Sequence, residues 1–213
     1  HEVNTPLAVI TSQLQMLMRQ LPSGDPHSHV LDRVVKQGFR ASEIINNLLK
    51  FSRVSGSEHV ELELNKTIQE TLSLVAPMLR SAKISVGTHL DPDSPTIHGN
   101  AGKLQQVFMN LIMYARDAMP YGGDLTVATT AVDSTVCVEI CDNGVGISPE
   151  HLRKIFDPFF TTKTTNRGTG LGLAVSYGII REHSGKIYVD SSVGRGASFR
   201  LEFPAARKPV NVL

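Results

Sequence analysis

The sequence lacks the features that would mark it as a specialised class of protein. It contains no tryptophan, only 6% aromatic residues and only two cysteines. Its 21 basic and 20 acidic residues leave a formal net charge of +1, so the strong basic bias of nucleic-acid-binding domains is missing and no nucleic-acid partner is expected. No apolar run approaches the roughly 20 residues that cross a bilayer, and no signal peptide is visible. With 41% hydrophobic residues, the composition is that of an ordinary globular protein.

The two cysteines, Cys137 and Cys141, lie four positions apart. In a strand they would share one face but stand too far apart for an easy disulfide. We therefore expect reduced thiols in the core and a cytoplasmic setting. The chain begins at His1 without an initiator Met. We expect it to be a fragment of a longer protein, with any sensor or membrane segment upstream.

Two long helical patterns open the chain, separated by the breaker cluster Pro22–Pro26. A short loop between long amphipathic helices predicts an antiparallel hairpin. Two helices alone cannot bury both apolar stripes, so a homodimeric four-helix bundle is expected. The alternative is a hairpin that packs on its own downstream domain. The stripes alternate spacings of three and four residues: Val3, Leu7, Ile10, Leu14, Leu17 and Leu21, then Leu31, Val34, Gly38, Ala41, Ile45 and Leu48.

After a short linker at Val54–Ser57 the pattern changes to α/β. Periodicity predicts helices over 66–80 and 101–118 and a strand over 83–90. Two hairpins are also expected, with turns at Asp133–Ser134 and Gly194–Gly196. Their strands carry alternating apolar residues: Leu125, Val127 and Thr129, Val136, Val138 and Ile140, Ile187 and Val189, and Phe199, Leu201 and Phe203.

The predicted fold class is therefore α+β. A helical hairpin over residues 1–56 precedes a domain over 57–213 that forms a two-layer α/β sandwich. In that sandwich, helices cover one face of a mostly antiparallel sheet.

Two glycine-bearing segments are the best candidates for chemistry. Asp142–Gly146 follows directly on a predicted strand, and Gly168–Leu173 leads into a helical pattern from Ala174 to His183. Glycines at a helix start let backbone N–H groups approach a phosphate, and the helix dipole favours an anion there. Each segment alone is weak evidence, because neither matches the P-loop or the dinucleotide-binding fingerprint.

The order of motifs is far more specific. Asn110 on a helix is followed by Asp142–Gly146, then Phe156–Lys163, then Gly168–Leu173, and the chain opens with His1–Leu7. This series resembles the N, G1, F, G2 and H boxes of sensor histidine kinases of two-component systems, over roughly residues 1 to 204. The resemblance implies a GHKL-type (Bergerat) ATP-binding domain after a dimerisation and phosphotransfer hairpin. It also implies ATP-dependent phosphorylation of the acceptor histidine and transfer to an aspartate of a response-regulator receiver domain.

The resemblance assigns roles to the second domain. Asp142 matches the aspartate that accepts a hydrogen bond from the adenine amine, and residues from about Asp157 to Gly170 match the mobile ATP lid. Phe156, Phe159 and Phe160 are expected to anchor this lid. The remaining predicted nucleotide contacts are Gly144 and Gly146 around the base, Lys163 and Arg167 at the phosphates, and Gly168, Gly170, Gly172 and Leu173 at the phosphate-side hinge.

The same resemblance makes His1 the phospho-acceptor and Glu2 its general base. Thr5 matches the polar residue associated with dephosphorylation of the regulator. His1 and Thr5, at i and i+4, share a helix face, and Pro6 would bend the helix just beyond the acceptor. Without this context, a lone N-terminal histidine would be interpreted as a frayed or tag-derived residue.

One position departs from the family pattern. The N box normally carries a second asparagine four residues after the first, where it coordinates Mg²⁺, and here that position is Tyr114. A phenol is a poor ligand for a hard cation. Three explanations stay open: an engineered inactivating substitution, a naturally degenerate site, or a Mg²⁺ held by Asn110 or Asp117 instead.

Two other functions compete with the kinase. The first is a dimeric interaction module that docks a regulator and supports only phosphatase work, which Tyr114 favours. The second is another ATPase of the same nucleotide fold, of gyrase, chaperone or mismatch-repair type, against which the His1 motif argues. The other seven histidines show no metal-ligand spacing beyond the pair His27 and His29, which we interpret as solvated surface.

Overall fold

The structure, a computed structural model, describes residues 4–22, 25–52, 59–93, 96–162 and 169–206. The chain divides into two compact units. The first comprises His1–Gly56 with Pro158–Leu171, and the second comprises Ser57–Asp157 with Gly172–Leu213. Each unit is described by itself.

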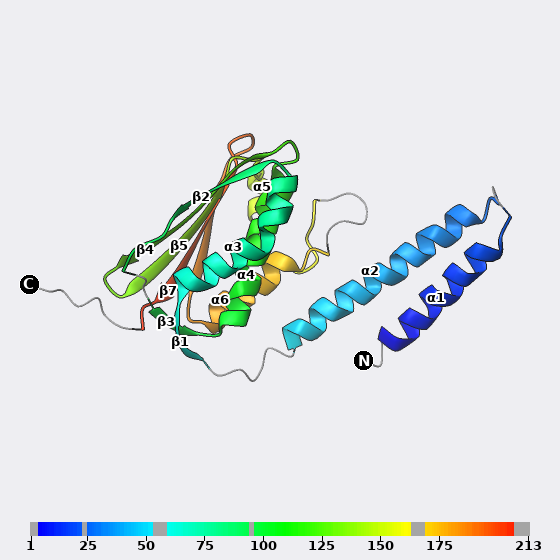
Figure 1. Cartoon of the computed structure of the whole chain (residues 1–213), viewed down its shortest axis with the longest axis horizontal. Coiled ribbons are helices and arrows are strands. Elements are labelled where there is room, and N and C mark those ends of the chain that lie inside the picture. The colour runs from blue at the N-terminus through cyan, green and yellow to red at the C-terminus, as the bar shows by residue number, and fades with distance from the viewer. Residues whose placement is uncertain (1–3, 23–24, 53–58, 94–95, 163–168, 207–213) are drawn as a thin grey trace, which may run out of the picture. The chain divides into compact units, whose positions relative to one another are not determined.

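The N-terminal unit contains the predicted helical hairpin. Helix α1 spans Asn4–Gln20 and α2 spans Ser28–Ser52, and Figure 1 shows them side by side in opposite directions. The loop between them is closed by the backbone N–H of Asp25, which donates to Pro22 O at 3.1 Å. At the start of α2, the N–H of His27 donates to Asp25 Oδ1 at 2.7 Å.

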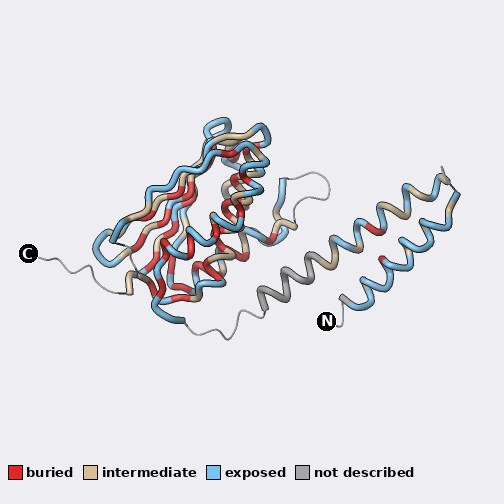
Figure 2. Tube along the Cα trace, viewed as in Figure 1, coloured by how far each residue is buried: buried red, intermediate tan, exposed pale blue. Residues whose placement is uncertain are grey.

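The hairpin buries only part of its apolar stripes. Thr11 on α1 and Val35 on α2 are buried where the helices meet. By contrast, Ile10, Leu17 and Val34 are 51%, 46% and 45% exposed. Figure 2 accordingly shows both helices as largely exposed or half-buried. Each helix therefore keeps an apolar row that the other does not cover.

The second unit is built on a five-stranded sheet with the order β2-β4-β5-β7-β6. Strands β2 and β4 are parallel and the other neighbours are antiparallel. The strands are β2 Ile84–His89, β4 Gly123–Val132, β5 Thr135–Asp142, β6 Lys186–Ser191 and β7 Ala197–Pro204.

Three helices cover one face of this sheet, as Figure 1 shows. They are α3 Leu64–Ser81, α4 Ala101–Ala118 and α6 Gly172–Glu182. The core lies between the layers, where every second residue of β5 is buried and the helices present apolar faces, and Figure 2 shows the buried positions concentrated there. The predicted two-layer α+β class is confirmed.

Both predicted hairpins of this unit are present. Val132 is the partner of Thr135, which leaves Asp133–Ser134 as the turn, and Asp133 has φ 55°. The pairing of Ser191 with Ala197 encloses the second turn in the same way.

Three elements were not predicted: strands β1 Val60–Glu63 and β3 Thr96–Gly99, which pair with each other, and the short helix α5 Pro149–Leu152. Only Leu62 is buried in β1, so β1 carries too little apolar alternation to be recognised from the sequence.

The prediction for the cysteines was half wrong. Cys137 and Cys141 are free thiols, as expected, but they are half-buried rather than part of the core. They alternate along β5 with the buried Val136, Val138 and Ile140, and so lie on the sheet face that the helices leave uncovered. Cys141 Sγ lies 3.3 Å from Ser198 Oγ. Partial burial raises the pKa of the Cys141 thiol, which keeps it protonated.

Gly38 and Thr11 provide a stability test of the hairpin. An added Cβ at Gly38 would lie 2.3 Å from Thr11 Cγ2. Thr11 cannot easily turn away, because its hydroxyl bonds to the carbonyls of Leu7 and Ala8. We expect Gly38→Ala to lower the free energy of unfolding by ~1 kcal/mol, as overpacking outweighs the better helix propensity of alanine.

In a Thr11→Ser background, which removes the Cγ2 methyl, we expect Gly38→Ala to become neutral or stabilising. Thermal unfolding of the four variants followed by helical circular dichroism measures both effects. An equal effect of Gly38→Ala in the two backgrounds would contradict this packing account.

Candidate active site

Asp142 ends β5 as a buried carboxylate with incomplete hydrogen bonding. Its side chain is only 7% exposed, and its Oδ1 accepts the backbone N–H of Gly144 at 2.9 Å. Its Oδ2 is buried and has no hydrogen-bond partner among the described residues. Burial raises the pKa of Asp142 despite the opposing backbone amides of Gly144 and Ala197. Oδ2 is therefore a buried acceptor whose missing hydrogen bond lowers the stability of the fold, and a ligand that donates a hydrogen bond there would compensate for it.

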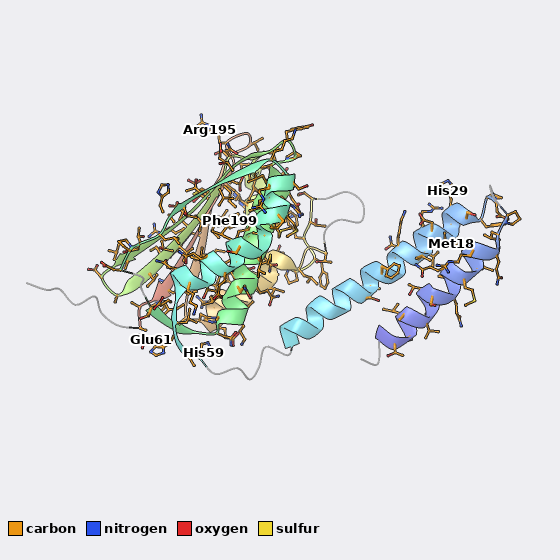
Figure 3. The ribbon with its side chains drawn as sticks, viewed as in Figure 1. Met18, His29, His59, Glu61, Arg195 and Phe199 are labelled. Carbon is orange, nitrogen blue, oxygen red and sulfur yellow. The ribbon has the colours of Figure 1, made fainter. Side chains whose placement is uncertain are left out.

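The glycine loop after Asp142 is clamped from two sides. On one side, the N–H of Val145 donates to Ala118 O at the end of α4, at 3.0 Å. On the other, Val145 O accepts from Gly194 in the β6–β7 turn at 2.8 Å, the turn that carries the labelled Arg195 in Figure 3. A Cβ at Gly144 would lie 2.5 Å from Ala118 O, and Gly146 has φ +71°. Both predicted site glycines are thus required by the protein's own packing.

Asn143, between the predicted site residues Asp142 and Gly144, was not given a role from the sequence. Its Oδ1 accepts the backbone N–H of Asp124 at 2.8 Å, and its Nδ2 donates to Asp124 Oδ2 at 2.9 Å. These bonds fasten the loop to β4, so Asn143 holds Asp142 in position. Asn143 and Asp124 are 19 positions apart, and no sequence spacing signals their contact.

Asn110, on α4, ties that helix to the beginning of α6. Its Nδ2 donates to Gly172 O at 3.0 Å and lies 3.1 Å from Ser176 Oγ. Ser176 is fully buried, and its hydroxyl also donates to Gly172 O at 2.9 Å. Because the amide nitrogen is engaged, Asn110 Oδ1 is the atom left to meet a cation. Ser176 was missed in the sequence, where a serine inside a helix carries no signal.

Gly172, the first residue of α6, is exposed, and Leu173 beside it is half-buried. A Cβ at Gly172 would meet Asn110 Cγ at 3.7 Å, an ordinary contact. Unlike Gly144 and Gly146, Gly172 is therefore not required by packing.

Tyr114 lies one helical turn after Asn110 and faces the sheet. Its ring packs edge-on against Phe199 of β7, with centroids 5.5 Å apart, and Figure 3 marks Phe199 between the sheet and the helices. Burial, and secondarily the charge of Asp142, raises the pKa of the Tyr114 phenol. The phenol therefore stays protonated and neutral, which makes it a poor partner for Mg²⁺.

Among the other metal candidates, Asp117 accepts two bonds from Arg116, at 2.9 and 2.5 Å. No group of three or more His, Cys, Asp or Glu that could hold a metal occurs in the described parts of the chain. Asn110 thus fits a Mg²⁺ ion through one amide oxygen, Tyr114 does not fit it, and Asp117 is committed to an ion pair.

The two ends of the predicted lid meet. The N–H of Phe159 donates to Gly170 O at 3.0 Å. Both residues are in the left-handed region, with φ 69° and +68°. Before the lid, Phe156 packs on Tyr177 of α6, with ring centroids 5.5 Å apart.

Several predicted site residues lie outside the described residues: His1, Glu2, Lys163, Arg167 and Gly168. Thr5 is described, in the first turn of α1, and is exposed. The structure thus brings together Asn110, Tyr114 and Asp142 with their supporting loops.

Comparison with known proteins identifies the family. Residues 99–207 match the family model for histidine kinase-, DNA gyrase B- and HSP90-like ATPases, and residues 1–57 match the His kinase A phospho-acceptor domain. The chain belongs to the sensor histidine kinase family. An ATPase domain of this family implies ATP binding, and the phospho-acceptor match separates the chain from the gyrase and chaperone branches. Curated relatives are named histidine kinases, so the interaction-module alternative is not favoured.

Curated histidine kinases align along nearly the whole chain. Histidine-protein kinase AtoS of Escherichia coli is 39% identical over 206 residues, which is 96% of this chain and 33% of AtoS. Sporulation kinase A of Bacillus subtilis is 36% identical over 205 residues, again 96% and 33%. Sensor protein FixL of Bradyrhizobium diazoefficiens is 35% identical, covering 97% of this chain and 42% of FixL. The kinase chain thus spans a third to two fifths of these relatives.

Solved histidine kinase structures are similar to this chain in fold. Histidine kinase ThkA in complex with response regulator protein TrrA has a TM-score of 0.70 at 26% identity, over 96% of this chain and 59% of that one. The nucleotide-free catalytic domain of ThkA has a TM-score of 0.63 at 32% identity, over 70% of this chain and 98% of that one. Among the described residues, no helix is long and apolar enough to cross a membrane.

Gly144 and Gly172 form a matched pair for a test of this site. We expect Gly144→Ala to destabilise the second unit by ~1–3 kcal/mol, because the Cβ would collide with a backbone carbonyl at 2.5 Å. Gly172→Ala should leave stability unchanged or slightly raised, because its Cβ has room. Denaturant unfolding of both variants compares them directly, and equal destabilisation would refute the distinction.

Proposed function

We propose that this chain is the catalytic core of a sensor histidine kinase that transfers the γ-phosphoryl group of ATP to His1 and then to an aspartate of a response-regulator receiver domain. The observation that carries the proposal is the buried, unpartnered Oδ2 of Asp142 at the end of β5. An adenine amine supplies the missing donor, and a site built to hydrogen-bond an N–H group rejects ligands that lack it.

The phosphate end of the nucleotide is proposed to meet the start of α6. Gly172 begins that helix and is exposed, so phosphate oxygens can approach free N–H groups at the positive end of the helix dipole. Gly168 and Gly170 would let the lid fold over the phosphates, and Lys163 would add a positive charge. Leu173 would pack beneath the phosphates.

Asn110 would contribute its Oδ1 to Mg²⁺ bound by the nucleotide phosphates. The metal, when bound, lowers the negative charge on the phosphates during transfer. Tyr114 supplies no second amide oxygen, so we expect this chain to transfer more slowly than a variant that has one.

The acceptor chemistry is assigned to the first turn of the chain. A neutral imidazole nitrogen of His1 attacks the γ-phosphorus, the P–N bond forms, and the bond to the β-phosphate oxygen breaks to release ADP. Glu2 accepts the proton from the other ring nitrogen, which keeps the imidazole nucleophilic as its positive charge develops.

Transfer to the regulator is assigned to the same segment. Thr5, four positions after His1 in the sequence, would position water when the receiver aspartate is dephosphorylated. A receiver domain as partner is supported by the solved relative ThkA, whose structure was determined in complex with the response regulator protein TrrA.

A homodimer is proposed from the hairpin surface. Ile10, Leu17 and Val34 expose about half of each side chain, and a second copy of the hairpin would cover this row in a four-helix bundle. The proposed boundary between the phosphotransfer domain, 1–56, and the ATP-binding domain, 57–213, lies in the linker. We propose that the chain acts in the cytoplasm, where ATP and reduced thiols are found.

Asp142 gives this proposal a pH signature. Only the ionised carboxylate offers Oδ2 as an acceptor, and burial raises the pKa of Asp142. ADP affinity should therefore fall as the pH is lowered through that raised value. Asp142→Asn should bind ADP weakly at every pH, with an affinity about tenfold or more below that of the parent chain with an ionised Asp142. Asp133→Asn, in an exposed turn, serves as the matched control in calorimetric titrations. Unchanged ADP affinity in Asp142→Asn would contradict the proposed adenine contact.

Tyr114 gives the proposal its activity test. Incubation with labelled ATP and Mg²⁺ should place acid-labile, base-stable phosphate on His1. Tyr114→Asn should label about tenfold or more faster, since it restores an amide oxygen near the phosphates. Tyr114→Phe keeps the ring packing and should label like the parent chain. No label on any folded variant would exclude the kinase, and equal rates in all three would show that Tyr114 does not limit it.

A further inference from the structure

His183, a residue that the proposed mechanism does not use, is buried at a junction of three elements. It follows α6 directly and is only 4% exposed. Its Nε2 accepts the backbone N–H of Asn100, just before α4, at 2.9 Å. Its Nδ1 lies 2.7 Å from Ile179 O in α6. Gly99 of β3 packs so closely that an added Cβ would lie 2.5 Å from the ring.

These partners fix the protonation state of the imidazole. A backbone N–H can only donate and a carbonyl can only accept, so Nε2 must carry a lone pair and Nδ1 the proton. Protonation of Nε2 would place its N–H opposite the N–H of Asn100, so the hydrogen bond between them would be lost. Only neutral His183 is compatible with this junction.

The same junction includes a second link between the helices. Asn100 caps α4 by accepting the N–H of Lys103 on its Oδ1 at 2.9 Å. Lys103, which is only 6% exposed, forms an ion pair with Glu182 at the end of α6. Seven residues after Lys103 on α4, Asn110 binds the first turn of α6. Helix α6 is therefore tied to the antiparallel α4 near both of its own ends, at Gly172 in the proposed nucleotide site and at Glu182 beside His183.

The charged and titratable groups around His183 come from three segments. His59, just before β1, lies with its ring centroid 4.9 Å from that of His183. Lys103 faces it from α4 and Glu182 from α6, and the ring of Phe203 covers it edge-on at 6.5 Å. Burial lowers the pKa of His183, with smaller contributions from His59 and Lys103, while Ile179 O and Glu182 oppose the shift.

We propose that neutral His183 is a positioning residue of the nucleotide site, which sets the register of α4 against α6 and makes nucleotide binding sensitive to acid. The inference rests on the proposed function, since it concerns regulation of the same site. When Nε2 is protonated, the start of α4 loses its attachment, and the helix that carries Asn110 is held against α6 by fewer bonds.

The direction of the pH effect follows from the shift. The folded-state pKa of His183 lies below the ordinary value of 6.5. The stabilising contribution of the neutral ring is therefore fully present above 6.5 and is lost as the pH falls from that value through the folded pKa. The effect on nucleotide binding runs the same way.

His183→Gln and His183→Phe separate positioning from packing. Glutamine keeps an acceptor and a donor but does not titrate, whereas phenylalanine keeps the ring and offers no acceptor. Titrations with ADP and Mg²⁺ run from about pH 7.5 down to the lowest pH at which the parent chain stays folded, because the folded-state pKa of His183 is lowered. As the pH falls, the ADP affinity of the parent chain should decrease by a factor on the order of tenfold larger than the decrease for His183→Gln. His183→Phe should be weak throughout, and His89→Gln, on the exposed end of β2, should follow the parent.

The difference between the parent and His183→Gln isolates this residue, because any acid effect at Asp142 is common to both. In parallel, nitrogen NMR of the parent should show His183 neutral with its proton on Nδ1, and faster exchange of the Asn100 amide as the ring titrates. Identical pH profiles for the parent and His183→Gln would overturn the inference. Absence of ADP binding at any pH would reject the proposed nucleotide site instead, while the Asn100 amide would still report on the junction.

Discussion

The geometry of the nucleotide site depends on one side chain amide, that of Asn110. Its nitrogen holds Gly172 O and meets Ser176 Oγ, so it fixes where α6 begins relative to α4. Without this bond the carbonyl of Gly172 would lose its side-chain link to α4, and the helix start proposed to meet phosphate would lose that attachment. An asparagine suits both tasks, because it donates through nitrogen to the protein while its oxygen remains for a ligand.

Asp142 imposes a complementary constraint. Burial of a carboxylate with one oxygen unpaired is destabilising, and the fold tolerates it because the surrounding loop is held independently of the ligand. Asn143 fastens that loop to β4, Ala118 O fastens it to α4, and the β6–β7 turn closes the third side. The loop is therefore preorganised, so a donor that binds Oδ2 does not have to order it on binding.

The sequence predicted most of this arrangement, for identifiable reasons. Strand alternation and helical periodicity are local, so α4 and both hairpins were placed well. The order of the motifs singled out Asn110 and Asp142, because each stands at a defined position within a recognisable box. The supporting contacts of Asn143, Ser176 and His183 join elements distant along the chain, such as Asn100 and His183 across 83 positions. Polar residues of this kind look like surface residues until the fold brings them together.

Tyr114 and Asn110 show why a motif match does not fix a mechanism. They lie one turn apart on the same helix face, yet the structure gives them different environments. The phenol packs against Phe199 in the core layer, where its neutral state is enforced by burial and by the nearby carboxylate. A ring at this position adds apolar packing against Phe199 and, in the proposed site, supplies no amide oxygen for a metal. In the proposed site, nucleotide affinity and phosphoryl transfer are thus separable: the first is assigned to Asp142 and its clamped loop, and the second to Asn110 and the start of α6, which would offset the phosphate charge without a second amide.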